Sequence, residues 1–192
     1  MSLVDIKEVD LFPVNILRVV TGLDHKAITE YTLEHRKKWD RYTTYHDKPL
    51  NLEWQAGLPD KEKLDKAIID VGHEFVRRTG RKPFNEPPFM YYWASVYDEG
   101  DQHGSHNHPN SLIAGTYYPA ASRDSSSIQL EAPWKSHTMH DNVGGGIFNY
   151  KPAPGDMLVW PSWLDHRVPA QVKSDNPRIA ISFNLDYNKY HD

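Results

Sequence analysis

Residues 146–187 read GIFNYKPAPGDMLVWPSWLDHRVPAQVKSDNPRIAISFNLDY. This stretch contains four short segments of aliphatic and aromatic residues, at 146–150, 156–160, 167–172 and 178–187, which Gly, Pro, Asn and Asp separate. Short runs of this composition, bounded by turn residues, are typical of β-strands rather than helices. The stretch therefore predicts four strands joined by turns.

The same pattern extends upstream to Pro83 and predicts three more strands, at 89–97, 111–118 and 126–132. Strands repeated at a spacing of roughly 8–15 residues are typical of a β-sandwich or barrel. We therefore expect residues 83–192 to form a β core.

The first 82 residues predict an edge strand, or two short strands, within 9–17 and two helices. One helix is expected to begin after Asp24 as its N-cap, and the other to run from Asp60, with a stripe of apolar residues at helical spacing, to Gly80. Residues 42–59 read as an aromatic-rich loop. No linker or repeat divides the sequence, so we expect a single domain over 1–192, mainly β with flanking helices.

Composition excludes several classes of function. The chain has 192 residues, a net charge of −4, 11 histidines and no cysteine. Without cysteine there are no disulfides, thiolate metal sites or cysteine nucleophiles. The sequence contains no block of positive charge, so we expect no nucleic-acid partner. No apolar run reaches the ~20 residues that span a membrane. The acidic N-terminus does not resemble a signal peptide, so the expected location is cytoplasmic.

Three histidines are the candidate metal ligands. His106 and His108 are separated by one residue, and His166 follows near another predicted strand. Alternate residues of a strand project from the same face, so the first two imidazoles would point to one place. A neighbouring strand would supply the third. Three protein ligands leave metal positions open for substrate or oxygen.

The segments around these histidines occur in a characteristic order. His-Asn-His-Pro precedes Gly115-Thr-Tyr-Tyr118, then Pro161-Ser-Trp-Leu-Asp-His166, then Arg-Ile-Ala-Ile-Ser-Phe-Asn from Arg178. Over about residues 88–187 this order resembles the Fe(II)- and 2-oxoglutarate-dependent oxygenase superfamily, and within it a family of small oxygenases of bacteria and phages.

The resemblance implies a double-stranded β-helix, a jelly-roll barrel with the metal at its mouth. It implies that His106 and His166 bind Fe(II) and that Arg178 binds the distal carboxylate of the cosubstrate 2-oxoglutarate, for which a guanidinium offers a bidentate fork. Tyr118 and Tyr97 match tyrosines of the cosubstrate pocket. The implied reaction uses O2 to hydroxylate a small molecule or a peptidyl residue, with no nucleic-acid or membrane partner.

The sequence departs from the superfamily at His108, where most members have Asp or Glu. Three neutral imidazoles would leave the metal a charge of +2, which dianionic 2-oxoglutarate would neutralise. Two alternatives are that His108 lies beside a two-histidine site completed by water, or that Glu131 supplies the missing carboxylate.

Three other functions share these residues. A cupin is suggested by Gly100 before His106-x-His108, but Leu112 and Ile113 stand where its glutamate is expected. A zinc hydrolase or lyase would use the same three histidines. A non-catalytic metal-binding barrel is the third. Under each of these functions, residues 42–59 and 119–146 are expected to line the entrance for the substrate.

Overall fold

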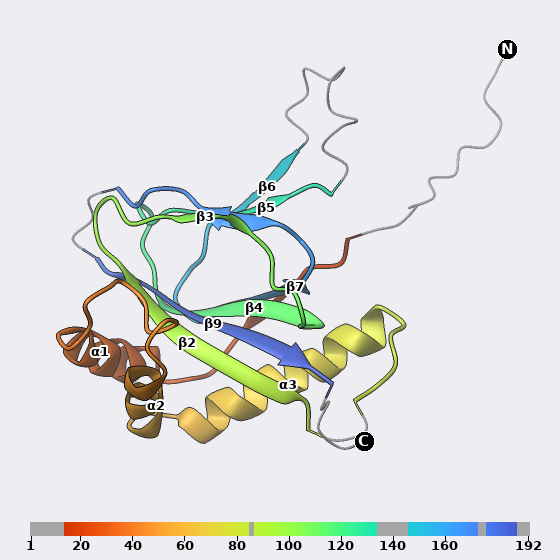
Figure 1. The fold of residues 1–192 in the computed structure, drawn as a ribbon, viewed down its shortest axis with the longest axis horizontal. Coiled ribbons are helices and arrows are strands. Elements are labelled where there is room, and N and C mark those ends of the chain that lie inside the picture. The colour runs from red at the N-terminus through yellow and green to blue at the C-terminus, as the bar shows by residue number, and fades with distance from the viewer. Residues whose placement is uncertain (1–13, 85–86, 134–145, 173–175, 188–192) are drawn as a thin grey trace, which may run out of the picture.

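The computed structural model describes residues 14–84, 87–133, 146–172 and 176–187, and these residues form two antiparallel sheets. The larger sheet has the order β1 (Leu17–Val20), β7 (Asp156–Pro161), β4 (Ile113–Ala120), β9 (Arg178–Asp186), β2 (Phe89–Tyr97). The smaller sheet has the order β3 (His103–His106), β8 (His166–Val168), β5 (Ile128–Glu131), β6 (Ile147–Tyr150). The two sheets face each other, and the helices cover the outer face of the larger one (Figure 1). The predicted fold class, mainly β with flanking helices, is confirmed.

The seven predicted strands all form, as β2 and β4 to β9, with end positions that differ by a few residues. The sequence missed β3, because His-Gly-Ser-His carries no apolar residue. In the described part of the chain, the predicted N-terminal edge strand overlaps the observed strand only at Leu17. Residues 1–13 lie outside the described part of the chain, and β1 begins only at Leu17.

Both predicted helices form, as α1 (His25–Arg36) and α3 (Lys61–Arg78). The Asp24 carboxylate accepts a hydrogen bond from the Ala27 N–H at 3.0 Å, as expected of an N-cap. The prediction of a loop over 42–59 was wrong in part, since residues 48–56 form α2 (Lys48–Ala56). This helix is short and owes its stability to the burial of Trp54, which local sequence does not reveal. No helix in the described parts of the chain is long and apolar enough to cross a membrane.

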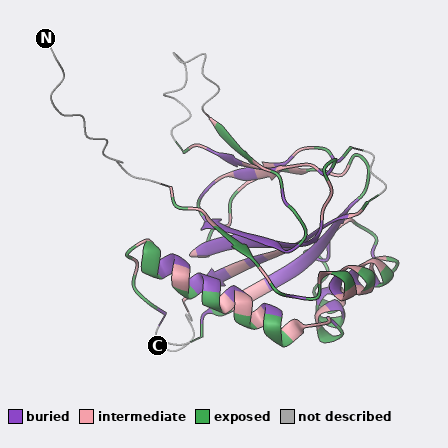
Figure 2. Cartoon of the chain, turned by 180° about the vertical axis from the view of Figure 1, so that it is seen from behind, coloured by how far each residue is buried: buried purple, intermediate pink, exposed green. Residues whose placement is uncertain are grey.

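The two faces of strand β9 (Arg178–Asp186) point into different environments, because alternate side chains project from opposite faces of the sheet. Its odd-numbered residues, from Ile179 to Leu185, are completely buried and belong to the core that the helices share with the larger sheet. Its even-numbered residues, from Arg178 to Asn184, therefore point toward the smaller sheet. The buried strands of the larger sheet are visible in Figure 2. The space between the sheets thus receives the polar side chains of β9.

Candidate active site

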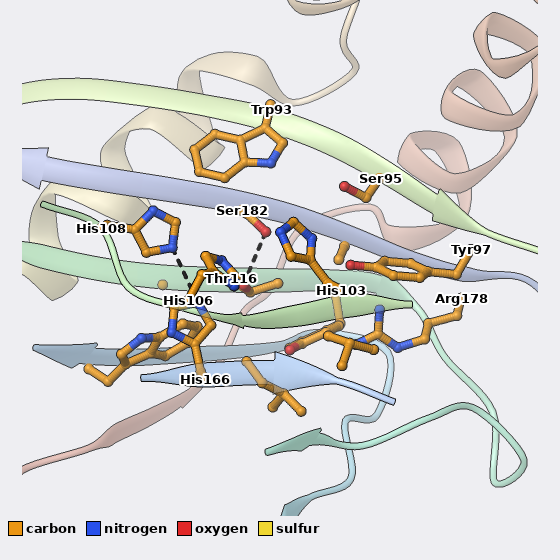
Figure 3. Close-up of a pocket in the computed structure, with 16 residues that line it drawn as sticks. Trp93, Ser95, Tyr97, His103, His106, His108, Thr116, His166, Arg178 and Ser182 are labelled. Carbon is orange, nitrogen blue, oxygen red and sulfur yellow. Dashed lines mark hydrogen bonds between the residues drawn. The ribbon is translucent and has the colours of Figure 1, made fainter. Parts of the chain in front are cut away.

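The three predicted histidines converge between the two sheets. His106 on β3 and His166 on β8 are direct partners across the smaller sheet, so their side chains project from the same face. One ring nitrogen from each of His106, His108 and His166 lies within 4.8 Å of the others. Figure 3 shows the three rings pointing toward one another. This spacing suits three ligands of one metal ion.

His108 reaches this cluster by a route that differs from the predicted one. Strand β3 ends at His106, so the alternation argument does not apply to His108. The His108 backbone N–H instead donates to the Ser162 carbonyl at 2.9 Å. That hydrogen bond ties the turn after β3 to the turn after β7, and it brings the third imidazole beside His166.

Hydrogen bonds and burial prepare two of the histidines to bind a metal. The Nδ1–H of His106 donates to the Gly104 carbonyl at 2.8 Å, and that of His166 donates to the Leu164 carbonyl at 2.9 Å. Each leaves Nε2 with a free lone pair. Burial, together with the smaller effect of the nearby His106, lowers the pKa of His166 to about 3 and that of His108 to about 4. Both rings are therefore neutral at pH 7, as ligation requires.

No carboxylate of the described residues belongs to the cluster. Glu131, the alternative ligand, is buried on β5, and its Oε1 lies 3.7 Å from Arg167 Nε. Its neighbour Leu130 points into the core between the sheets, so Glu131 faces away from the histidines. The geometry favours His108 over Glu131 as the third ligand.

Arg178 is buried at the far end of the same cavity, with 1% of its surface exposed. Its guanidinium carbon lies 4.3 Å from the ring centre of Tyr97 and 5.6 Å from that of Tyr118. Its Nε donates to the Ser126 carbonyl, but Nη1 and the Tyr118 hydroxyl have no hydrogen-bond partner among the described residues. A buried cation without a counter-charge is costly, so this end of the cavity suits an anionic ligand.

Two cavities meet at the histidines. The inner cavity extends to Arg178, and the outer cavity, of about 380 Å³, extends toward Tyr45, His46 and Asn110. Trp93, His103, His106 and His108 line both. Residues 42–59 thus contribute to the entrance, as predicted. Part of the other predicted rim, 134–145, lies outside the described residues.

Several polar side chains of the site escaped the sequence analysis. Ser95, Thr116 and Ser182 line the inner cavity, and Asn184 lines the outer one. Each occupies an alternate position of a strand whose other face is apolar, and this pattern was the available signal. The ring of His103, which lies close to the histidine pair in the sequence, stacks on the ring of His106 with centroids 4.2 Å apart.

Comparison with known proteins agrees with this geometry. The model of a family described as 2OG-Fe(II) oxygenases matches residues 91–184, which include the three histidines and Arg178. No curated protein sequence matches the chain.

Solved structures share its fold at low sequence identity. AviO1 from Streptomyces viridochromogenes Tue57 superposes with a TM-score of 0.62 at 13% identity, over 90% of each chain. A Pseudomonas putida prolyl-4-hydroxylase superposes with a TM-score of 0.56 at 11% identity, over 91% of this chain and 94% of its own. HygX from Streptomyces hygroscopicus, with nickel and 2-oxoglutarate bound, superposes with a TM-score of 0.57 at 11% identity, over 92% of this chain and 84% of its own.

These matches define the class as oxidoreductases built on a double-stranded β-helix. Residues 91–184 thus match the Fe(II)- and 2-oxoglutarate-dependent oxygenase superfamily, as the order of the sequence segments predicted. That family uses Fe(II), 2-oxoglutarate and O2. The match favours an oxygenase over the cupin alternative.

Proposed function

We propose that the protein is a 2-oxoglutarate-dependent dioxygenase in which His106, His108 and His166 hold one Fe(II). The observation that carries the proposal is the buried Arg178, which has no ionic partner among the described residues, in the cavity that these histidines close. Three neutral imidazoles are a donor set that suits Fe(II), and the buried guanidinium requires an anion. A metal and a dicarboxylate together satisfy both ends of the cavity.

The residues around 2-oxoglutarate have distinct tasks. Arg178 binds its distal carboxylate with a bidentate fork. Burial raises the pKa of Tyr118 above its usual value, so the phenol stays protonated and its O–H donates to the same carboxylate. Tyr97 covers the other side of the guanidinium. When bound, Fe(II) and 2-oxoglutarate supply the activation of O2, with release of succinate and CO2.

The outer cavity takes the primary substrate beside the histidines. Its volume of about 380 Å³ suits a small molecule or one side chain of a peptide. Trp93 and Tyr45 form an aromatic wall, with ring centres 4.8 Å apart, and Asn107 and Asn110 offer amide groups. Its described lining contains no carboxylate, ammonium or guanidinium group. We therefore expect the part of the substrate that enters this cavity to carry no formal charge.

Succinate formation tests the function. With Fe(II), ascorbate and O2, the purified chain should convert 2-oxoglutarate to succinate slowly in the absence of substrate. A true substrate should accelerate succinate formation, and mass spectrometry should show that it has gained one oxygen atom. His166→Ala should lose both metal binding and succinate formation. Equal metal occupancy in His166→Ala and the parent would reject the metal site. Absence of succinate from the metal-loaded parent across the substrate panel would reject the dioxygenase.

A further inference from the structure

Asn184 stands beside the third metal-binding histidine, the one in which this chain departs from its superfamily. Its Nδ2 lies 3.3 Å from Nδ1 of His108, and its Oδ1 is buried without a hydrogen-bond partner among the described residues. The residue comes from β9, two positions beyond Ser182 on the face that lines the cavities. Its contact with His108 bears on which nitrogen of that ring carries the proton.

The metal-free hydrogen bonds form one consistent chain. His166 donates through Nδ1 to the Leu164 carbonyl, so its Nε2 can only accept. His108 Nε2 lies 3.2 Å from that atom and must therefore carry a proton and donate it. The Nδ1 of a neutral His108 is then an acceptor, and it receives the Asn184 amide N–H.

This arrangement is incompatible with a metal on His108. A metal bound between His108 and His166 takes the Nε2 lone pair of each ring. The proton of His108 must then reside on Nδ1, which becomes a donor. The Asn184 Nδ2 cannot accept it, but Oδ1 can, once the amide has rotated by half a turn. Because Oδ1 has no partner to lose in the described parts of the chain, the rotation exchanges one hydrogen bond for another.

We infer that Asn184 is a positioning residue whose amide has two settings, donating to His108 in the metal-free protein and accepting from it in the metal-bound protein. This inference rests on the proposed metal site. In the metal-bound protein the Asn184 amide would accept the Nδ1–H of His108, as a backbone carbonyl does for His106 and for His166. A neutral partner also preserves the +2 charge that the dianionic cosubstrate would neutralise.

Zn(II), which is diamagnetic, allows the tautomer itself to be measured in the full chain. In protein labelled with ¹⁵N-histidine, NMR should show His108 protonated on Nε2 without metal and on Nδ1 with Zn(II). Detection of the Nδ1–H form in the metal-free parent would overturn the inference.

Substitutions separate the two settings of the amide. An aspartate can only accept, so metal-free Asn184→Asp should already show Nδ1–H on His108 and should bind Zn(II) at least as tightly as the parent. Asn184→Leu removes the partner and should weaken Zn(II) binding by about 10–100-fold. Asn149→Leu makes the same change at an exposed position of β6, where the amide oxygen accepts a hydrogen bond from Gln129, and this control should bind Zn(II) like the parent.

Calorimetric titration with Zn(II) distinguishes failure of this inference from failure of the metal site. If His166→Ala loses Zn(II) while Asn184→Leu and Asn184→Asp match the parent, the metal site stands and the role of Asn184 falls. Weaker binding by Asn184→Asp than by Asn184→Leu would also overturn the inference. If the parent itself binds no Zn(II), both proposals fail. Thermal unfolding of each metal-free variant checks that the affinities refer to folded protein.

Discussion

At the scale of single residues, Arg178 combines two properties that rarely occur together. It is almost completely buried, yet none of the described residues pairs with it as an ionic partner. The aromatic rings of Tyr97 and Tyr118 partly stabilise the cation through their faces. A buried charge without an ionic partner is costly, and this supports the proposed role of Arg178 in binding an anionic ligand.

Replacing Arg178 should therefore weaken 2-oxoglutarate binding without removing the metal. We expect Arg178→Ala to lose roughly 2–4 kcal/mol, or ~30–1000-fold in affinity, measured by calorimetry on the Ni(II)-loaded protein. Arg178→Lys should recover only part, since an ammonium is not a planar fork. Arg167→Ala removes an arginine from β8, outside both cavities, and should leave the affinity unchanged. An unaltered affinity in Arg178→Ala would exclude this arginine as the anchor.

At the scale of secondary-structure elements, Asp156 holds three segments together at the start of β7. Its carboxylate, 2% exposed, accepts hydrogen bonds from Arg18 on β1, from the Tyr150 hydroxyl on β6 and from the Ala153 N–H, at 2.6–2.8 Å. Burial raises the pKa of this carboxyl, but the hydrogen bonds outweigh burial and bring it below its usual value. Asp156 thus links an edge of each sheet.

This linkage predicts a pH-dependent stability. As the pH falls below about 5, the unfolded carboxyl takes up a proton before the folded one does, so the free energy of unfolding decreases. Asp156→Asn should lower it by about 1–3 kcal/mol at pH 7 and weaken that acid dependence, as measured by urea unfolding across pH. The control is Asp70→Asn on α3, an exposed ion-paired residue that should cost under about 1 kcal/mol. Equal losses in the two variants would contradict the linking role.

At the scale of the whole molecule, the site exists only when the two sheets are closed over each other. The three clustered histidines come from the smaller sheet and the turn that follows β3, whereas Arg178 and Asn184 come from the larger sheet. Ligands that bridge these parts bind only the folded protein, and they stabilise it by mass action.

Ligand binding should accordingly raise the melting temperature in a defined order. With Ni(II) bound, 2-oxoglutarate at 100 times its Kd should add ~2.7 kcal/mol, or roughly 5–10 °C for a domain of this size. Without metal the shift should be much smaller, because only the Arg178 end of the cavity is engaged. Differential scanning calorimetry of the parent and of His166→Ala provides the comparison. Equal shifts in both proteins would show that 2-oxoglutarate binds elsewhere.

The sequence by itself determined the strands of the core and much of the site. Short runs of aliphatic and aromatic residues bounded by turn residues located β2 and β4 to β9, because such side chains pack well on the faces of a sheet. The histidines and Arg178 were recognisable from residue type and order. The strand patterns are local in the sequence. The site residues stand out because few residue types can bind a metal or a carboxylate.

The tertiary structure alone decided the remaining features, since they depend on contacts between distant segments. Helix α2 forms because Trp54 is buried against the rest of the protein. His108 joins the other ligands through a backbone hydrogen bond to Ser162, and not through the alternation of a strand. Asn184 meets His108 across 76 positions of sequence. No pattern within either segment specifies such a meeting, because pairing of the strands and packing of the two sheets set the distance between them.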